Sequence, residues 1–201
     1  DSEYSFYHAI KDPNSIVLMG SSELTGKDTN QTKPFNFIPR YTHFNLLGIG
    51  HAGNQSFSIF TQLLSAGQNL KDSKIVIMIA PSWFTNNYRS GTSPASFLEF
   101  NNDRYLLRII NHSDRNPQFI NYVEKYIAKN YSQIEFPSSA IKYLYYKDLS
   151  AQGNFYKIAY TPIIKTLGII NDFSLFKIED DYFFPIVNND TPDQENRQVL
   201  D

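Results

Sequence analysis

Short apolar runs bounded by turn-forming residues characterise the first 85 residues of the chain. The runs at 15–19, 44–49 and 74–80 are each followed by glycine or proline, which predicts three buried β-strands. The run at 74–80 is continuous and β-branched, which is typical of a central strand of a parallel sheet. The spacing of apolar residues over 54–68 predicts a helix, and the polar segment 25–39 with its two prolines predicts a loop. Strands that alternate with such crossovers predict an α/β domain.

From residue 94 the apolar positions follow a helical period instead. Helices are expected at 102–110, 117–130, 138–149 and 155–167. We therefore interpret 1–93 as an α/β core and 94–178 as a helical insertion or lobe beside the sheet. The last segment, 179–201, contains seven acidic residues and one arginine, which predicts an extended, solvated and flexible tail.

Composition excludes several classes of protein. The chain has 201 residues, 41% of them hydrophobic, which is enough for a substantial core. A net charge of −2 argues against a nucleic-acid partner, and the absence of cysteine excludes disulfides, thiolate metal sites and a cysteine nucleophile. The longest apolar run has six residues, too short to cross a membrane. Because the chain begins with Asp rather than Met, we expect that an N-terminal segment has been removed.

The turn after the first predicted strand reads Gly20-Ser21-Ser22-Glu23-Leu24. Parallel sheets place ligands and nucleophiles at the carboxyl ends of their strands, where a serine is exposed and neighbouring backbone N–H groups can face an oxyanion. The alternative is a plain turn whose serines cap the next segment.

Two further motifs follow the second and third predicted strands. In residues 50–56 (GHAGNQS), Gly53 permits close backbone approach, although Asn54 has an alternative role as the helix N-cap. After the third strand comes Pro81-Ser82-Trp83-Phe84, whose tryptophan is either a pocket wall or a packing residue. Because the ends of parallel strands share one edge, these motifs predict a single site built from Ser22, Gly53 and the segment around Ser82 and Trp83.

The three motifs together resemble the DltD family over about residues 16–84. This is a family of extracytoplasmic proteins of teichoic acid D-alanylation, and its core is similar to that of the SGNH (GDSL-like) esterases and acyltransferases. The resemblance implies a three-layer SGNH- or flavodoxin-like parallel sheet with a helical lobe. Since only three strong strand signals occur, we expect that sheet to be incomplete at the C-terminus of this chain.

The resemblance also implies roles for individual residues. Ser22 corresponds to the nucleophile, and its N–H and that of Gly53 form part of the oxyanion hole. The further oxyanion or substrate-binding positions are Ser21, Asn54, Gln55, Ser82 and Trp83. Two positions depart from the patterns: Ser21 replaces the superfamily's aspartate, and Ser82 replaces the glutamine more common in DltD-like sequences.

The base that a serine nucleophile needs is missing from the sequence pattern. The SGNH pattern supplies it from an Asp-x-x-His motif, and none of the four histidines has an aspartate three residues before it. We interpret His51 and His112 as surface residues. Either the catalytic pair lies in a part of the protein beyond this chain, or the protein works without hydrolysis.

Three hypotheses follow. In the first, Ser22 transfers a D-alanyl group from an ester or thioester to teichoic acid, and a D-alanyl carrier protein or membrane acyltransferase docks on the helical lobe. The protein is then anchored N-terminally on the outer face of the cytoplasmic membrane, and no cofactor or metal is expected. The second hypothesis is a non-catalytic scaffold for the same partners. The third, a flavodoxin-like cofactor binder, is weakened because a polar segment with prolines follows residues 20–26.

Overall fold

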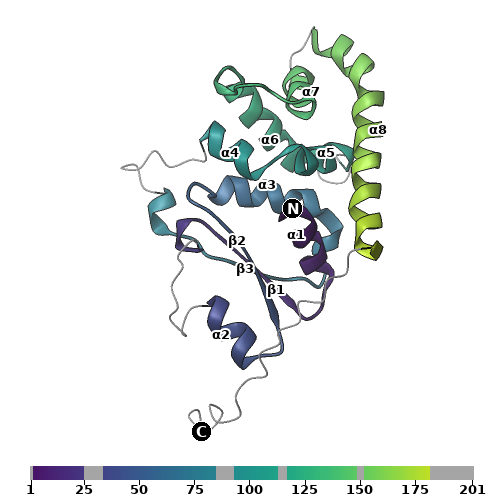
Figure 1. The fold of residues 1–201 in the computed structure, drawn as a ribbon. Coiled ribbons are helices and arrows are strands. Elements are labelled where there is room, and N and C mark those ends of the chain that lie inside the picture. The colour runs from purple at the N-terminus through teal and green to yellow at the C-terminus, as the bar shows by residue number, and fades with distance from the viewer. Residues whose placement is uncertain (1, 25–33, 85–92, 113–116, 149–151, 182–201) are drawn as a thin grey trace.

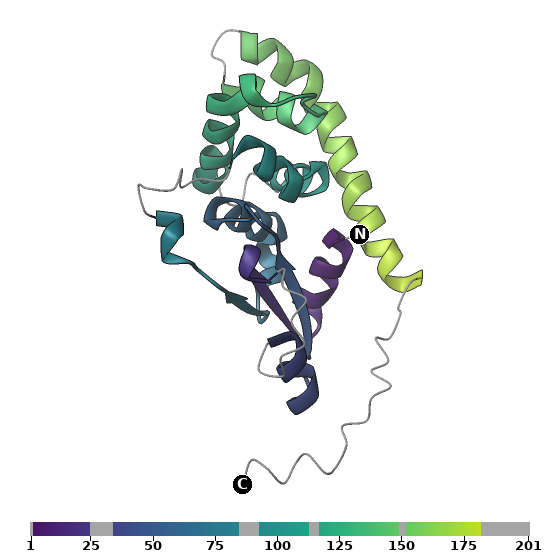
Figure 2. The ribbon, with the colours of Figure 1, turned by 60° about the vertical axis from the view of Figure 1, so that its left-hand side comes forward.

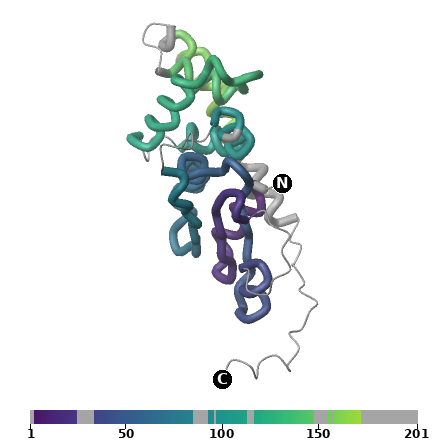
Figure 3. The backbone as a smooth tube through the Cα atoms, turned by 90° about the vertical axis from the view of Figure 1, so that its left-hand side faces the viewer, coloured from purple at the N-terminus to yellow at the C-terminus, as the bar shows by residue number. Residues whose placement is uncertain are grey.

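A computed structural model of the chain describes residues 2–24, 34–84, 93–112, 117–148 and 152–181. The first part of the expected loop (25–33) and most of the expected tail (182–201) lie outside these residues. Figure 1 shows a sheet at one end of the molecule, a layer of helices at the other, and a long helix along one side. Figure 3 shows the same order of sheet and helices from the side.

The sheet has three parallel strands, as predicted: β1 (Ser15–Gly20), β2 (Asn45–Gly50) and β3 (Lys74–Ile77), in the order β2-β1-β3. The expectation that the third strand is central is wrong, because β1 lies between the other two. Burial agrees with this order: β1 is almost entirely buried, whereas Val76 on β3 and Ile79 just after it are 50% and 59% exposed. β3 therefore forms an apolar edge of the described sheet.

Helices cover both faces of the sheet. α1 (Ser2–Lys11) and α3 (Ser56–Ala66) pack on the face that carries Val17 and Met19. α2 (Pro34–Tyr41) lies against the opposite face, where the Phe35 ring covers Gly48. The expected loop over 25–39 is therefore wrong for its second part, since Pro34 begins a helix, a position that proline favours. α1 was not predicted from the sequence either.

Five helices form the second part of the molecule (Figures 1 and 2): α4 (Pro94–Phe100), α5 (Asp103–Asn111), α6 (Pro117–Asn130), α7 (Ser139–Asp148) and α8 (Gln152–Asp181). The four predicted helices are confirmed, and α4 is additional. α8 continues well past residue 167, the expected end. Gly168 does not end it but permits close approach to α5, because a Cβ there would lie 3.1 Å from the Cβ of Asn111.

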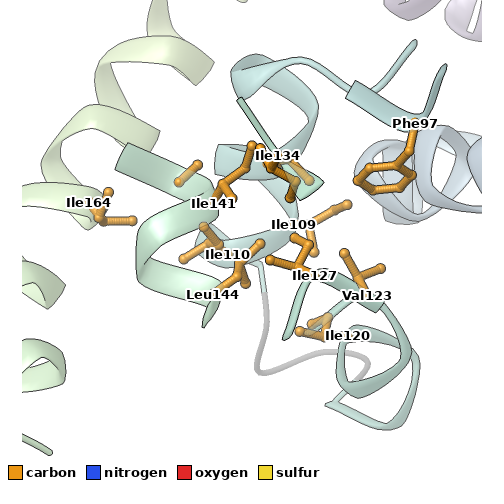
Figure 4. Packing of buried hydrophobic residues seen from close by; sticks show 12 residues of the cluster. Phe97, Ile109, Ile110, Ile120, Val123, Ile127, Ile134, Ile141, Leu144 and Ile164 are labelled. Atoms are coloured by element: carbon orange, nitrogen blue, oxygen red, sulfur yellow. The ribbon is translucent and has the colours of Figure 1, made fainter. Parts of the chain in front are cut away.

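The buried apolar residues form two clusters. The helical core, shown in Figure 4, comprises Phe97, Leu106, Ile109, Ile110, Ile120, Val123, Ile127, Ile134, Ala140, Ile141, Leu144 and Ile164. The sheet core comprises Phe6, Tyr7, Ala9, Ile10, Val17, Met19, Ile59, Ala66, Trp83 and Tyr105. α5 contributes to both, and so it holds the two cores together. The division of the chain at residues 93 and 178 stays a prediction.

A buried arginine on α5 connects this helix to the sheet side. Arg108 is only 3% exposed, and its Nε donates a hydrogen bond of 3.1 Å to the carbonyl oxygen of Ser65 on α3. Its guanidinium carbon lies 4.5 Å from the centroid of the Tyr7 ring on α1. The hydroxyls of Tyr7 and Ser65 are 2.8 Å apart and hydrogen-bonded. One charged group thus contacts two helices of the sheet core at once.

We expect Arg108→Ala to lower the free energy of unfolding by about 2–4 kcal/mol, because it removes a charge-assisted hydrogen bond and leaves a cavity between three helices. Denaturant unfolding of the purified protein measures the change. Arg40→Ala, at an exposed position on α2, is the control and should cost less than about 1 kcal/mol. Equal losses for the two variants would contradict the role given to Arg108.

Candidate functional site

The candidate site begins where β1 and β2 end side by side. Their last residues, Gly20 and Gly50, are partners in the parallel register. The short 3₁₀-helix η1 (Ser22–Leu24) follows β1 at once and folds back over both glycines. A Cβ on Gly20 would lie 2.7 Å from Glu23 Oε1, and one on Gly50 would lie 2.7 Å from Leu24 Cδ1. η1 can therefore pack this closely only because neither strand end carries a side chain.

Ser21, just before η1, and Ser22, its first residue, lie in different environments. Ser21 is buried, its N–H donates to Glu23 Oε1 at 2.6 Å, and its Oγ donates to the carbonyl oxygen of His51 at 3.3 Å. Ser22, the first residue of η1, is exposed. Ser21 thus fixes the turn to the loop after β2, while Ser22 presents its side chain at the surface.

The loop after β2 is fixed to β1 by a buried asparagine. Asn54 has no exposed surface, and its Nδ2 donates to the carbonyl oxygen of Gly20 at 3.2 Å. Asn54 Oδ1 has no hydrogen-bond partner among the described residues. Interpreting Asn54 as the N-cap of α3 is wrong, because Gln55 occupies that position without a side-chain cap bond. Gly53 has a φ of 92°, a conformation that favours glycine.

The third motif folds as the 3₁₀-helix η3 (Pro81–Phe84) beyond β3. Pairing with β1 continues past the strand, since the N–H of Met78 donates to the carbonyl oxygen of Met19 at 2.8 Å. Ser82 is exposed, whereas Trp83 is buried in the sheet core. The packing interpretation of Trp83 is therefore favoured over a pocket wall. The hydrogen bonds of Ser21 and Asn54 bring the first two motifs together, and the third motif follows β3, the strand on the other side of β1.

His51 lies beside α4, a helix that the sequence pattern did not reveal. Its Nδ1 is 3.9 Å from Glu99 Oε1, and both side chains are exposed, so the attraction is weak. The end of α4 is fixed on α3 by buried amides: Gln62 Nε2 donates to the carbonyl oxygen of Phe100 at 2.9 Å, and Asn101 Nδ2 donates to Ser58 Oγ at 2.6 Å. The polar residues Ser58 and Gln62, one helical turn apart within a largely apolar helix, are the signal in the sequence for this contact.

Two negative findings concern the described residues alone. They contain no group of three or more histidine, aspartate or glutamate side chains placed to hold a metal ion. None of the helices they form has the length and apolar character needed to cross a bilayer.

Parallel strands whose carboxyl ends carry an exposed serine and a glycine with positive φ define an α/β protein with a candidate site at the strand ends. The chain belongs to the DltD family, because the family model described as "DltD protein" matches residues 1–199. Membership implies involvement in teichoic acid D-alanylation. The match extends the resemblance from residues 16–84 to the helical part. Comparison with curated proteins gives no match.

We expect Gly50→Ala to lower the free energy of unfolding by about 1–3 kcal/mol, because the new methyl group overlaps Leu24. Denaturant unfolding measures the effect in a double-mutant cycle with Leu24→Gly, which also removes the Leu24 Cβ that would lie 2.8 Å from the new methyl group. Because the smaller residue makes room for the methyl group, the double variant should lose less free energy of unfolding than the sum of the losses of the two single variants. Strict additivity would show that η1 does not press on the strand end.

Proposed function

We propose that this protein performs a D-alanyl transfer step outside the cytoplasmic membrane, with Ser22 as the nucleophile. The observation that supports the proposal is the exposed Ser22 at the start of η1, on a turn that two glycines and Ser21 hold against the strand ends. A serine on such a tight turn is accessible to a large acyl donor while its backbone stays fixed.

The chemistry has two steps. Ser22 Oγ attacks the carbonyl carbon of a D-alanyl ester or thioester and loses its proton to a base, and the donor's alcohol or thiol leaves with a proton. A hydroxyl of teichoic acid then attacks the D-alanyl–Ser22 ester, which returns the proton to Ser22 and forms the product ester. In both steps the carbonyl oxygen becomes negative, and N–H groups fixed beside it lower the barrier.

The proposed oxyanion donors are the N–H groups of Ser22 and Gly53. Asn54 supports this assignment, because its buried amide ties the loop that carries Gly53 to the end of β1. Ser21 and Asn54 thus act as positioning residues. Gln55 and Ser82 are proposed to flank the substrate, and the buried Trp83 is proposed to hold the segment that carries Ser82 through its packing in the sheet core.

The helical part is the proposed docking surface for the D-alanyl carrier protein or the membrane acyltransferase. Its support is the outer face of α8, where Phe155 and Ile158 are 73% and 78% exposed and Ile163, Ile169 and Ile170 are also exposed. Exposed apolar surface of this extent marks interaction sites. The proposed location, N-terminally anchored on the outer face of the cytoplasmic membrane, places this surface near such partners.

A second candidate is a scaffold that brings carrier, acyltransferase and teichoic acid together without catalysis. Two observations favour it: no histidine follows the Asp-x-x-His pattern, and the imidazole of His51 lies beside Glu99 of α4 in solvent. The scaffold would use the α8 surface in the same way but would not need the Ser22 hydroxyl.

Ser22→Ala separates the two candidates. In cells whose only copy of the protein carries this change, we expect the D-alanine ester content of teichoic acid to fall to the level of cells without the protein, because the acyl-serine cannot form. Ser5→Ala, at an exposed position on α1, is the control and should retain full content. Full D-alanylation with Ser22→Ala would reject the nucleophile and favour the scaffold.

The docking surface is tested by Phe155→Ser combined with Ile158→Ser. Both candidates predict a D-alanine content at least severalfold lower, while the free energy of unfolding changes by less than about 1 kcal/mol, because both side chains are exposed. Tyr122→Ser on α6, an exposed aromatic position elsewhere, is the control. Unchanged D-alanine content in the double variant would remove α8 from the proposal.

A further inference from the structure

A cavity of about 220 Å³ lies between α7 and α8. Its lining residues are Lys142, Tyr143, Tyr146, Tyr156 and Tyr160. α7 packs on α8, and the part of α8 that lines the cavity lies at the end of the molecule away from the sheet (Figure 2). The cavity is therefore separate from the strand ends that carry Ser22.

The tyrosine rings around the cavity support one another. Tyr146 and Tyr156 are stacked with centroids 4.1 Å apart and planes 7° from parallel, and Tyr160 lies 5.7 Å beyond Tyr156. Tyr145, 5.2 Å from Tyr146, stacks in turn on Tyr131 at 3.7 Å. Such contacts between rings restrict their rotation, so the aromatic walls are arranged before any ligand binds.

The hydroxyl groups and one cation give the cavity its chemical character. Tyr143 has its hydroxyl 3.5 Å from Thr161 Oγ1, and four phenolic groups line the same space. Among the lining residues that the structure describes, Lys142 alone carries a charge and none is a carboxylate. Its positive charge attracts an anion and disfavours the cationic ligands that other aromatic cages bind.

These properties fit a small anionic polyol. Aromatic faces contact the C–H groups of a sugar or polyol, phenolic hydroxyls pair with its hydroxyls, and an ammonium group binds phosphate. The volume is below the roughly 300 Å³ at which pockets for drug-sized ligands begin, so the cavity suits a single small sugar or polyol. We propose that this cavity binds a phosphorylated polyol, either a sugar phosphate or an open-chain glycerol phosphate. The proposal does not rest on the role of Ser22.

Calorimetric titration of the purified protein tests the proposal with glucose 6-phosphate and sn-glycerol 3-phosphate. Glucose, glycerol, inorganic phosphate and choline are the comparison probes. We expect saturable binding of at least one phosphorylated polyol, weakened about tenfold or more by Lys142→Gln and by Tyr156→Leu. Lys125→Gln and Tyr122→Leu, exposed positions on α6 outside the lining, should bind as the unchanged protein does.

Tyr160→Leu is a second aromatic variant, because its ring is partly exposed and its loss disturbs the stack less. Circular dichroism verifies that each variant is folded. A preference for the sugar or for the glycerol compound identifies the form of the ligand, and either supports the proposal. Any of three results would overturn the proposal: inorganic phosphate or choline binds as tightly as both phosphorylated polyols, all variants bind equally well, or no saturable binding occurs. Ser22→Ala should bind unchanged, so this result is independent of the proposed transfer.

Discussion

The guanidinium of Arg108 is buried at the boundary between the two cores, and the position of α5 depends on it. Removing such a charge from water is costly unless it is hydrogen-bonded. Here the guanidinium donates a hydrogen bond to the carbonyl oxygen of Ser65 and lies over the ring of Tyr7. Because the helix is held in this orientation, Tyr105 enters the sheet core while Leu106 and Ile109 enter the helical core. The arrangement of the helical part relative to the strand ends therefore depends on buried polar contacts, this one and those of Gln62 and Asn101, as well as on apolar burial.

Strong periodic patterns were enough to predict all three strands and the helices α3, α5, α6, α7 and α8. They did not predict the order of the strands. The apolar run at 74–80 indicates that these residues favour burial but does not say which strands lie beside them, and Val76 is in fact half exposed at the edge of the sheet. α2 was hidden by its two prolines, although Pro34 stands where a helix accepts it. α8 was predicted too short because Gly168, a packing residue, resembles a terminator.

The candidate site, like the fold, could be predicted from the sequence only in part. Parallel topology predicted that all three motifs lie at one edge of the sheet. The contacts of Ser21 and Asn54 join the first two motifs, and the single site built from all three stays a prediction. The partners themselves could not be predicted, because the asparagine binds a carbonyl oxygen 34 positions away in the chain. The contact of His51 with Glu99 depends in turn on where α4 packs, which no local pattern contains. Local sequence thus predicts which residues belong to a candidate site, while the contacts between them depend on the whole fold.

The separation of Ser22 from the tyrosine cavity has a consequence for how a polymer could be modified. An exposed serine ester is open to water, so transfer prevails over hydrolysis only if the acceptor hydroxyl is present at high local concentration. A polymer of repeating polyol phosphate units can occupy one position through one unit while another unit reacts elsewhere. Binding of one unit in the tyrosine cavity, beside the first part of α8, would then raise the concentration of acceptor hydroxyls near the strand ends without adding any group to the reaction centre. Such an arrangement favours a repetitive substrate over a single small alcohol.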